Sequence, residues 1–230
     1  MTDVNVASFE AFLQAWTVRQ NKYLEDLRSA QQHCHELQDA DLRVLISMVL
    51  SHYQQYFEEK SRIAQHNVLL VFSPPWFSSL ERTFLWIAGF KPGTGVQLVN
   101  TALDDLTEEQ NMRLRQLKQE TKSEERVLND KLAKIHESVA APPLVEMGRH
   151  HGRLCLNELG IAEENEVPSS LKASLEALVA NADELRINTV LKIVEILRPA
   201  QTVKLLVAVA ELLHKIRMWG LENDKQRSIG

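Results

Sequence analysis

Histidine and cysteine are the residues of this sequence best suited to chemistry, and they form two short clusters. His33, Cys34 and His35 are consecutive, as are His150 and His151. Imidazole and thiolate are good ligands for zinc and copper. On a helix, however, residues one or two positions apart point to different sides, whereas chelation needs a spacing of three or four. We therefore favour helix-surface histidines over a metal site, and metal binding by these residues stays open.

A second pair with ligand chemistry lies near the C-terminus, where His214 precedes Met218 by four residues. Residues four apart share one face of a helix, and histidine with methionine can ligate haem iron. Helical cores use both residue types for packing, which is the other interpretation of His214. The main expectation is no cofactor, and haem held by His214 is the alternative.

Motifs of the common enzyme classes do not occur in the sequence. The glycine-rich stretch 89–95 lacks the spacing of a phosphate-binding loop and follows a predicted helix rather than a strand. There is no Gly-x-Ser-x-Gly, no His-Glu-x-x-His and no cysteine pair with zinc spacing. Acidic residues form pairs such as Glu108-Glu109, which is typical of a solvated helix face. We predict that the chain is not an enzyme.

Large aromatic residues gather between positions 74 and 92, with five of them inside fifteen positions around a predicted helix start. One interpretation is a corner of the core. The other is a partner groove, because aromatic side chains of this size also anchor protein interfaces. Both stay open. The candidate partner-binding residues, including two from the last predicted helix, are Trp76, Phe77, Trp86, Phe90, Arg217 and Trp219.

The elements that must position these residues are helices. Apolar residues recur at three- and four-residue steps, and only eight glycines and seven prolines interrupt 230 residues. Ser78-x-x-Glu81 and Thr107-x-x-Gln110 have the spacing of capping boxes. Ser169 or Ser170 can cap the next-to-last helix, and Pro199 can start the last. The predicted helices cover about 8–34, 42–73, 78–86, 96–103, 107–138, 144–159, 171–197 and 199–220, with Asp39 or Asp41 as the cap of the second.

We therefore predict an all-α fold, a single antiparallel helical bundle of about seven to nine helices. No linker is long enough to separate two domains, so one domain covers 1–230, with a core over about 8–222 and a disordered tail at 223–230. The stretch from Val203 to Ile216 contains charged residues and is too short to span a membrane. The first ten residues lack the basic flank and apolar block of a signal peptide, so export is not expected.

The composition narrows the class of partner. The net charge is −5 and the hydrophobic fraction is 44%, values typical of a soluble globular chain. No basic stripe offers a surface for a phosphate backbone, so direct nucleic-acid binding is not expected. Two cysteines, Cys34 and Cys155, are too few for a disulfide framework, which favours a reducing compartment.

Motifs spread along the chain resemble the plant Delay of Germination (DOG) domain family. Phe9-x-x-Phe12-x-x-x-Trp16 resembles the family's opening. The middle segment 76–92 contains Trp-x-x-Ser-Leu-Glu, then Leu-Trp-Ile-x-Gly and a proline. Ala182-Asp-Glu-Leu-Arg186 and Pro199-x-Gln201 resemble its late helices, and Trp219-Gly220 its close. The resemblance covers nearly the whole chain and includes the C-terminal half of TGA-type bZIP transcription factors.

The resemblance implies a non-enzymatic regulator in plant nuclei and cytoplasm, acting in transcriptional control, abscisic-acid and seed-dormancy signalling, or development. The implied partners are proteins, among them type 2C phosphatases, bZIP transcription factors or a second copy of the chain. Unlike the TGA branch, this sequence has no basic region followed by leucine heptads, so direct DNA reading is not expected.

A haem site is also implied by the dormancy branch, through two histidines four apart before the Trp-Gly close. Here Arg217 stands two positions before Trp219 and cannot ligate iron, because arginine stays protonated. At most His214 remains as a ligand. The alternative function is therefore a sensor that holds haem or an apolar ligand inside the bundle.

Overall fold

The computed structural model describes residues 2–34, 36–139 and 168–229, and it builds them into eight helices with no strand. The all-α prediction is confirmed. His35, His150, His151, Cys155 and the helix predicted over 144–159 lie outside the described residues. The helices are α1 (Thr2–Gln32), α2 (Asp39–His66), α3 (Val68–Phe72), α4 (Ser79–Thr83), α5 (Pro92–Ala102), α6 (Glu108–Val139), α8 (Ser169–Ile196) and α9 (Pro199–Ile229).

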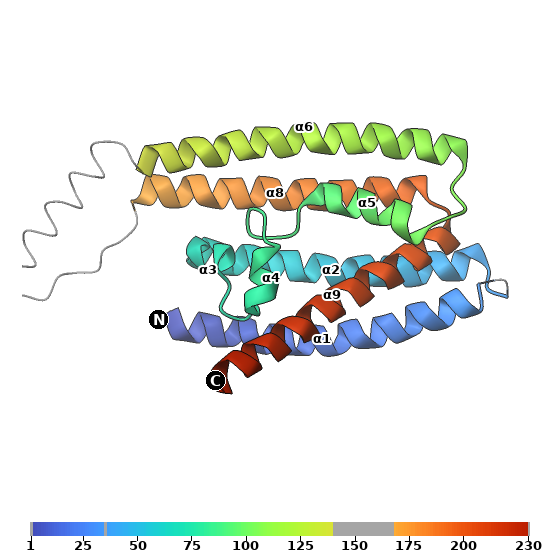
Figure 1. Ribbon diagram of the computed structural model, residues 1–230, viewed down its shortest axis with the longest axis horizontal. Helices are drawn as coiled ribbons and strands as arrows, with labels where there is room; N and C mark the ends of the chain where they lie inside the picture. Colours follow the sequence, from blue (N-terminus) through green and yellow to red (C-terminus); the bar gives the residue numbers. More distant parts are fainter. Residues whose placement is uncertain (1, 35, 140–167, 230) are drawn as a thin grey trace, which may run out of the picture.

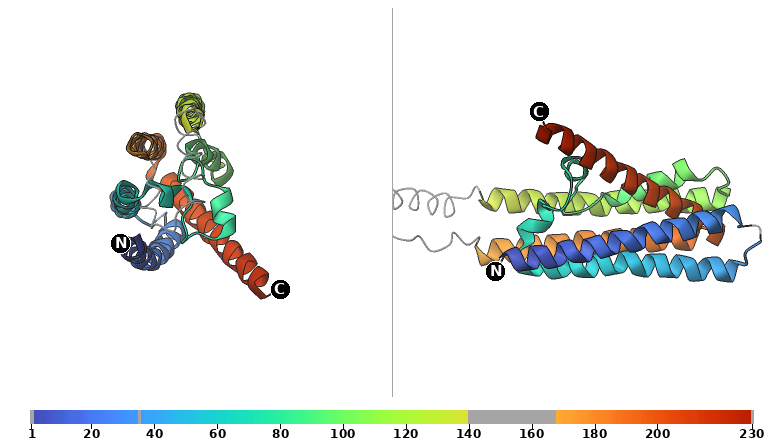
Figure 2. Two further views of the ribbon diagram at one scale, coloured as in Figure 1. Left: turned by 90° about the vertical axis from the view of Figure 1, so that its left-hand side faces the viewer. Right: turned by 90° about the horizontal axis from the view of Figure 1, so that it is seen from below.

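The long helices form two antiparallel pairs joined by α9. Helix α1 packs against α2, and α6 packs against α8 (Figure 1). Helix α9 crosses the bundle obliquely and contacts α1, α2 and α5, while α5 lies between α6, α8 and α9. The second half of α9 diverges from the long helices and lies against α4 (Figure 2). The predicted antiparallel bundle is confirmed.

Two apolar clusters hold this arrangement, and α9 belongs to both. The first joins α1 and α2 to α9 through residues such as Leu27, Val49 and Val203. The second joins α5, α6 and α8 to the same helix through residues such as Val99 and Leu205. Burial of such side chains stabilises the fold by roughly 2 kcal/mol each. The last long helix is therefore the element that unites the two pairs.

Both predicted capping boxes are present. Ser78 Oγ accepts from the backbone N–H of Glu81 at 3.2 Å, and the Ser78 N–H donates to Glu81 Oε2 at 2.8 Å. The Gln110 N–H donates to Thr107 Oγ1 at 3.2 Å, and the Thr107 N–H donates to Gln110 Oε1 at 3.0 Å. These bonds satisfy amides that a helix start leaves unpaired.

Several helix boundaries differ from the predictions, among them a break at Asn67 that separates α2 from α3 and a start of α5 at Pro92 rather than Val96. Helix α4 ends at Thr83 rather than Trp86, because residues 86–89 form a tight turn whose carbonyls face another helix. Helix α1 begins at Thr2 rather than Ser8. Helix α8 follows Pro168 directly, without a side-chain cap from either serine. Pro168 itself occupies the N-cap position, so both serines lie inside the helix.

The prediction that the last helix ends at Gly220 is wrong. Helix α9 continues through Ile229, so residues 223–229, expected to be disordered, are helical. Gly220 is buried because it meets α4, and Asp224 one turn further on accepts a hydrogen bond from the Ser79 N–H at 2.9 Å. Gly220 does not adopt the left-handed conformation of a helix end, and its lack of a side chain lets α4 approach α9 closely.

Candidate functional site

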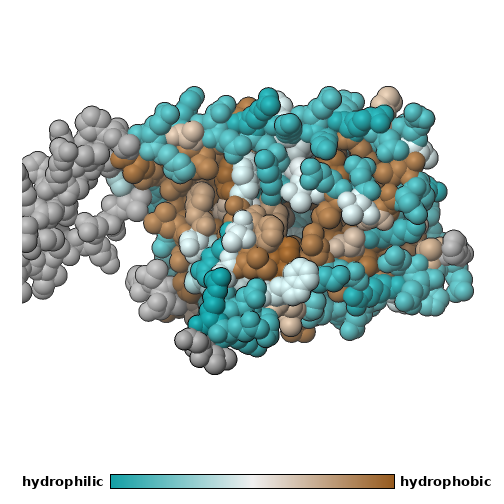
Figure 3. Space-filling view, in the orientation of Figure 1, coloured by the Kyte–Doolittle hydropathy of each residue, from teal (hydrophilic) through white to brown (hydrophobic). Residues whose placement is uncertain are grey.

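A cavity of about 800 Å³ lies between α1, α2, α8 and α9 and is bordered by the segment after α4. In the space-filling view, apolar side chains gather over the centre of one face, around a hollow and inside a polar rim (Figure 3). A volume of this size is within the range that holds a small organic ligand. Apolar wall residues from the four helices include Leu13, Leu50, Ile193, Val194, Leu205 and Leu213.

The polar part of the cavity is built from α2 and α8. Lys60 Nζ donates to Asp183 Oδ1 at 2.7 Å, and its side chain is only 3% exposed. Arg186, three residues after Asp183 on the same helix, donates to the same oxygen through Nη1 at 2.6 Å. One carboxylate oxygen therefore serves two buried cations.

Arg186 also fixes the turn that follows α4. Its Nε donates to the Phe90 carbonyl at 2.7 Å and its Nη2 to the Ile87 carbonyl at 3.0 Å, with a further bond to the Trp86 carbonyl. Ile87 and Ala88 have φ values of 44° and 60°. This conformation is costly for residues other than glycine, above all for a β-branched one. Four bonds from one buried guanidinium, counting Asp183, hold it in place.

Gly89 allows the guanidinium to approach the turn. A Cβ at this position would stand 2.7 Å from Arg186 Cζ and 2.8 Å from Nε. The Trp86 ring lies on another side of the guanidinium, with its centroid 5.4 Å from Cζ, a cation–π distance. Trp86 also donates through Nε1 to Asn129 Oδ1 of α6 at 2.8 Å. The segment 86–90 is therefore a rigid border of the cavity.

Burial shifts the titration of the groups around this polar part. Desolvation lowers the pKa of Lys60 to about 8, against a smaller opposing effect of Asp183. Desolvation raises the pKa of Tyr53 to about 12, and it also raises the pKa of Tyr56. Both tyrosines line the cavity and are uncharged at neutral pH.

A second polar contact closes the cavity border between α4 and α9. Arg217 Nη1 donates to Glu81 Oε1 at 3.2 Å. The other oxygen of Glu81 accepts from Ser78, so this carboxylate both caps α4 and pairs with α9. Ser79 donates to Asp224 through its N–H and its hydroxyl. These contacts attach the short helix α4 to the diverging half of α9.

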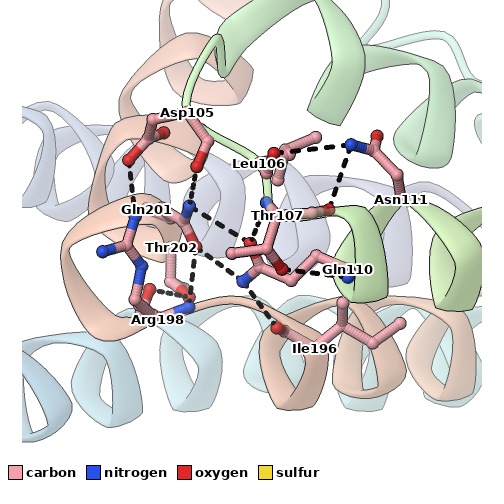
Figure 4. Close-up of polar contacts among 9 residues, drawn as sticks. All are labelled: Asp105, Leu106, Thr107, Gln110, Asn111, Ile196, Arg198, Gln201 and Thr202. Atoms are coloured by element: carbon pink, nitrogen blue, oxygen red, sulfur yellow. Dashed lines mark hydrogen bonds and ion pairs between the residues drawn. The ribbon is translucent and has the colours of Figure 1, made fainter.

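A polar cluster at the junction between α8 and α9 locks the loop before α6 onto these two helices (Figure 4). Gln110 Nε2 donates to the Ile196 carbonyl at 2.9 Å and to Gln201 Oε1 at 2.8 Å. Gln201 Nε2 donates to the Asp105 carbonyl at 3.1 Å, and Arg198 donates to the Asp105 carboxylate at 2.7 Å. Gln201 is 1% exposed, so its amide serves the fold.

Of the six residues predicted to bind a partner, three line the cavity. Phe77, Phe90 and Arg217 do so, together with His214, the residue of the haem alternative. They come from the segments around α4 and from α9, which the sequence separates by more than 120 positions. The structure therefore brings these residues to one cavity, but not to one exposed surface.

The three tryptophans among those six lie in different environments. Trp76 packs against Phe9 with ring centroids 4.3 Å apart, inside the cluster formed by α1, α2 and α3. Trp86 is held by Asn129 and Arg186. Trp219 is 60% exposed on α9. Each interpretation of the aromatic segment 76–90 therefore fits one residue. Trp76 packs in the core, whereas Phe90 is 36% exposed and remains accessible to a partner.

The described residues that line the cavity offer haem one histidine, while Tyr53 and Tyr56 are further side chains of a type that can ligate haem iron. His214 is the single imidazole among them, and they include no methionine or cysteine. Met218 is 52% exposed and is not part of the lining. Arg217 is paired with Glu81. Among the described lining residues there is no second histidine to pair with His214 at a haem iron.

The described residues contain no group of three or more histidine, cysteine or acidic side chains that could hold a metal ion. His33 lies at the end of α1, where its Nδ1 is 2.9 Å from the Ser29 carbonyl, and Cys34 follows as a free, half-buried thiol. Within the same ranges, no helix is long and apolar enough to cross a membrane.

Sequence reasoning did not identify Lys60 and Asp183 as part of a site. Lys60 directly follows two acidic residues, Glu58 and Glu59, and these neighbours give no sign that it is buried. Arg186 and Gln201 appeared only inside motifs that carry the family resemblance. A cation at a position of the apolar helix stripe is the signal that could have pointed to Lys60.

The fold and the site define a class, a helical bundle with a central apolar cavity and a buried polar cluster on its wall. A family model described as seed dormancy control matches residues 23–101. Protein ZW2 of Arabidopsis thaliana is 37% identical over 217 residues, which cover 93% of this chain and 96% of that protein. Protein RESPONSE TO ABA AND SALT 1 of the same plant is 33% identical over 226 residues, 96% of each chain.

Transcription factor TGA3 of Arabidopsis thaliana is 32% identical over 216 residues, which cover 92% of this chain and 53% of TGA3. The chain thus spans about half the length of that relative. The protein belongs to the DOG domain family, the seed dormancy control family, and the sequence resemblance is confirmed. Among these relatives are a plant transcription factor and a plant protein named for its response to ABA and salt, which supports a regulatory role in plants.

Proposed function

We propose that the chain is a non-enzymatic regulatory module that acts by binding protein partners in abscisic-acid, dormancy or developmental signalling, in the nucleus and cytoplasm. Relatives named as a transcription factor and as a protein of the response to abscisic acid and salt support this proposal. The partners would be type 2C phosphatases, bZIP factors or a second copy of the chain. Direct DNA reading is not part of the proposal, because the sequence has no basic region followed by leucine heptads.

The exposed Trp219 is the observation on which partner binding depends most. Its side chain is 60% exposed, and Met218 beside it is 52% exposed. Tryptophan is enriched at the centres of protein interfaces. The next residue, Gly220, is packed against Ser78, so this part of α9 is held rigidly while the indole remains free for a partner. A rigid anchor loses little conformational entropy on binding.

The test is a pull-down from plant extract with Trp219→Ala against the unchanged chain. Val44→Ala is the matched control, because Val44 is 61% exposed on α2, far from α9 in sequence. We expect Trp219→Ala to lose partners that Val44→Ala retains. Trp76→Ala and Trp86→Ala are less suitable, since both side chains pack inside the molecule. Identical partner sets for both exposed variants would contradict the role of Trp219.

A second candidate function, the binding of an apolar ligand, is favoured by the cavity itself. Five cationic side chains line it, and Glu81 is the single carboxylate among the described lining residues; the cations are Arg43, Lys60, Lys91, Arg186 and Arg217. The excess of positive charge favours an apolar body with an acidic group. Haem, with its two propionates, is one such ligand, and His214 would be its iron ligand.

The two ligand types are separated by simple titrations. Fluorescence of 1-anilinonaphthalene-8-sulfonate bound to the purified chain should fall when a long-chain carboxylate is added, and less so with the alcohol of equal length. Haem added in the same way should give a visible Soret band that His214→Ala shifts or removes. If no carboxylate displaces the dye and no Soret band forms, the ligand hypothesis is rejected.

A further inference from the structure

Lys60 is a buried amine whose charge is only partly balanced. Among the described residues its one hydrogen bond goes to Asp183 Oδ1, at 2.7 Å. That oxygen also accepts from Arg186 Nη1 at 2.6 Å. The three side chains thus carry a net charge of +1 if all are ionised, at a position from which water is largely excluded. Burying an unbalanced charge is costly.

The other charged and titratable groups near this cluster do not remove the excess. Tyr56, one turn before Lys60 on α2, is uncharged, because burial raises its pKa. Glu81 of α4 is already paired with Arg217 of α9. The Phe57 ring, with its centroid 5.8 Å from Lys60 Nζ, adds only a weak cation–π contact. Arginine does not lose its proton in proteins, so Lys60 is the group that can relieve the excess charge by becoming neutral.

A neutral lysine amine is a nucleophile. Enzymes produce one by desolvating a lysine or by placing it next to another cation, and both conditions hold at Lys60. The amine also borders a cavity of about 800 Å³ with apolar walls. We propose that Lys60 is a covalent capture site for apolar aldehydes, which enter the cavity and are held there as imines.

The chemistry needs no further reactant. The lone pair of Lys60 Nζ forms a bond to the aldehyde carbon, and the carbonyl oxygen becomes a hydroxyl as a proton moves from nitrogen to oxygen. The C–O bond then breaks, water leaves, and a C=N bond remains. Asp183 Oδ1, 2.7 Å from Nζ, is placed to relay the proton. One amine and one aldehyde give one imine and one water, with no oxidation or reduction.

Aldehyde capture at Lys60 is independent of partner binding through Trp219. It rests on the second candidate function only in requiring that the cavity admits an apolar molecule. The apolar walls would select aldehydes with a long chain. They would also keep water from the imine, which slows its hydrolysis. Exposed lysines outside the cavity lining, such as Lys172 and Lys192 with side chains 41% and 56% exposed, have neither advantage.

The experiment uses the purified chain with nonanal and sodium cyanoborohydride, which reduces an imine to a stable secondary amine. Digestion with a glutamate-specific protease and mass spectrometry then locate the nonyl groups. At pH 8 we expect Lys60 to be modified about tenfold faster than the exposed Lys172 or Lys192, because desolvation favours the neutral form of Lys60. Propanal, too short to use the apolar walls, should show a smaller preference for Lys60.

Lys60→Met provides the matched variant, and it should lose the preferred modification while the exposed lysines react as before. If that variant does not fold, a competition experiment with the unchanged chain replaces it. Nonanol added together with nonanal should reduce the modification of Lys60 and leave that of Lys192 unchanged. Modification of the exposed lysines without Lys60 overturns the proposal.

Dye displacement separates this failure from a failure of the cavity. If nonanol displaces 1-anilinonaphthalene-8-sulfonate but Lys60 is never modified, the capture proposal is wrong and the cavity still binds apolar molecules. If nonanol displaces no dye and Lys60 is not modified, the capture proposal and the second candidate function are both wrong.

Discussion

Gly220 of α9 lies directly against Ser78, the N-cap residue of α4. A Cβ on residue 220 would stand 2.7 Å from Ser78 Cβ, closer than non-bonded carbon atoms approach, and 3.2 Å from Leu80 Cβ. The contact lets α9 continue past the glycine while α4 packs on it. The Glu81–Arg217 and Ser79–Asp224 contacts lie on either side of this point along α9.

Gly220→Ala should therefore destabilise the protein by about 2 kcal/mol, since a forced overlap in a packed interface has costs of this size. Inside an unpacked helix the same change would stabilise by about 1 kcal/mol, so the sign of the effect is diagnostic. Urea denaturation measures it.

The matched control for this change is Gly95→Ala in α5, where a Cβ would meet only Ile193 Cδ1 at 3.9 Å. We expect no loss of stability from that variant. Ser78→Gly should restore part of what Gly220→Ala loses, because glycine is a tolerated N-cap. A stabilised Gly220→Ala protein would show that α4 does not pack on α9.

The Lys60–Asp183–Arg186 cluster predicts an asymmetry between two substitutions. Asp183→Asn leaves two buried cations without their shared carboxylate and should reduce the free energy of unfolding by about 3 kcal/mol or more. Lys60→Met leaves Asp183 paired with Arg186 and should cost less than about 1 kcal/mol. Equal losses in urea denaturation would contradict this charge arrangement.

The same cluster predicts how stability responds to alkaline pH. The pKa of Lys60 is about 8 in the folded protein, against 10.5 for a solvated lysine side chain, so the unfolded chain binds more protons between these values. The free energy of unfolding should therefore rise as the pH increases from 8 toward 10. Lys60→Met should remove this rise. Above pH 10, ionisation of Tyr53 and Tyr56 in the unfolded chain should reverse the trend.

The buried His52 is expected to make the folded protein less stable in mild acid. Its ring is buried, stacked on Trp16 with centroids 4.4 Å apart, and its Nε2 has no hydrogen-bond partner among the described residues. Desolvation, with a smaller effect of Arg19, lowers the pKa of His52 from 6.5 to about 4. The unfolded chain therefore binds more protons between pH 6.5 and 4. Stability should fall as the pH falls through this range, by about 2 kcal/mol once solvent screening is allowed for.

His52→Phe keeps a flat aromatic ring on Trp16 and removes the titrating group. Its free energy of unfolding should change less than that of the unchanged chain between pH 6.5 and 4. His33→Phe is the control, because His33 is exposed at the end of α1 and its removal should leave the pH dependence as it is. Equal acid sensitivity in all three proteins would show that His52 is protonated in the fold.

Gln201, which belongs to one of the family motifs, is expected to stabilise the fold. Gln201→Leu leaves Gln110 Nε2 with one acceptor fewer and leaves the Asp105 carbonyl and the Arg198 N–H without this partner. Loss of several buried hydrogen bonds should reduce the free energy of unfolding by about 2–3 kcal/mol.

The control for Gln201 is Gln116→Leu on α6, which removes an exposed bond to Glu120 and should change stability by less than about 0.5 kcal/mol. Partner capture by well-folded Gln201→Leu should be unchanged, because the residue is buried far from Trp219. Loss of partners without loss of stability would assign Gln201 a functional role.

The sequence alone determined the helices and most of their starts. The apolar periodicity, Pro199 and the two capping boxes are local signals, because each depends on residues within a few positions of one another. The family resemblance could also be recognised from the sequence, because its motifs follow one another in order along the chain.

Tertiary structure decided where helices stop and which side chains share a site. The turn at 86–89 exists because Arg186, about 100 positions later, binds its carbonyls, and α9 passes Gly220 because α4 packs there. Lys60 and Asp183 are 123 positions apart, and their contact is created only when α2 and α8 pack together. Local propensity carries no information on such distant contacts, because burial is a property of the assembled bundle.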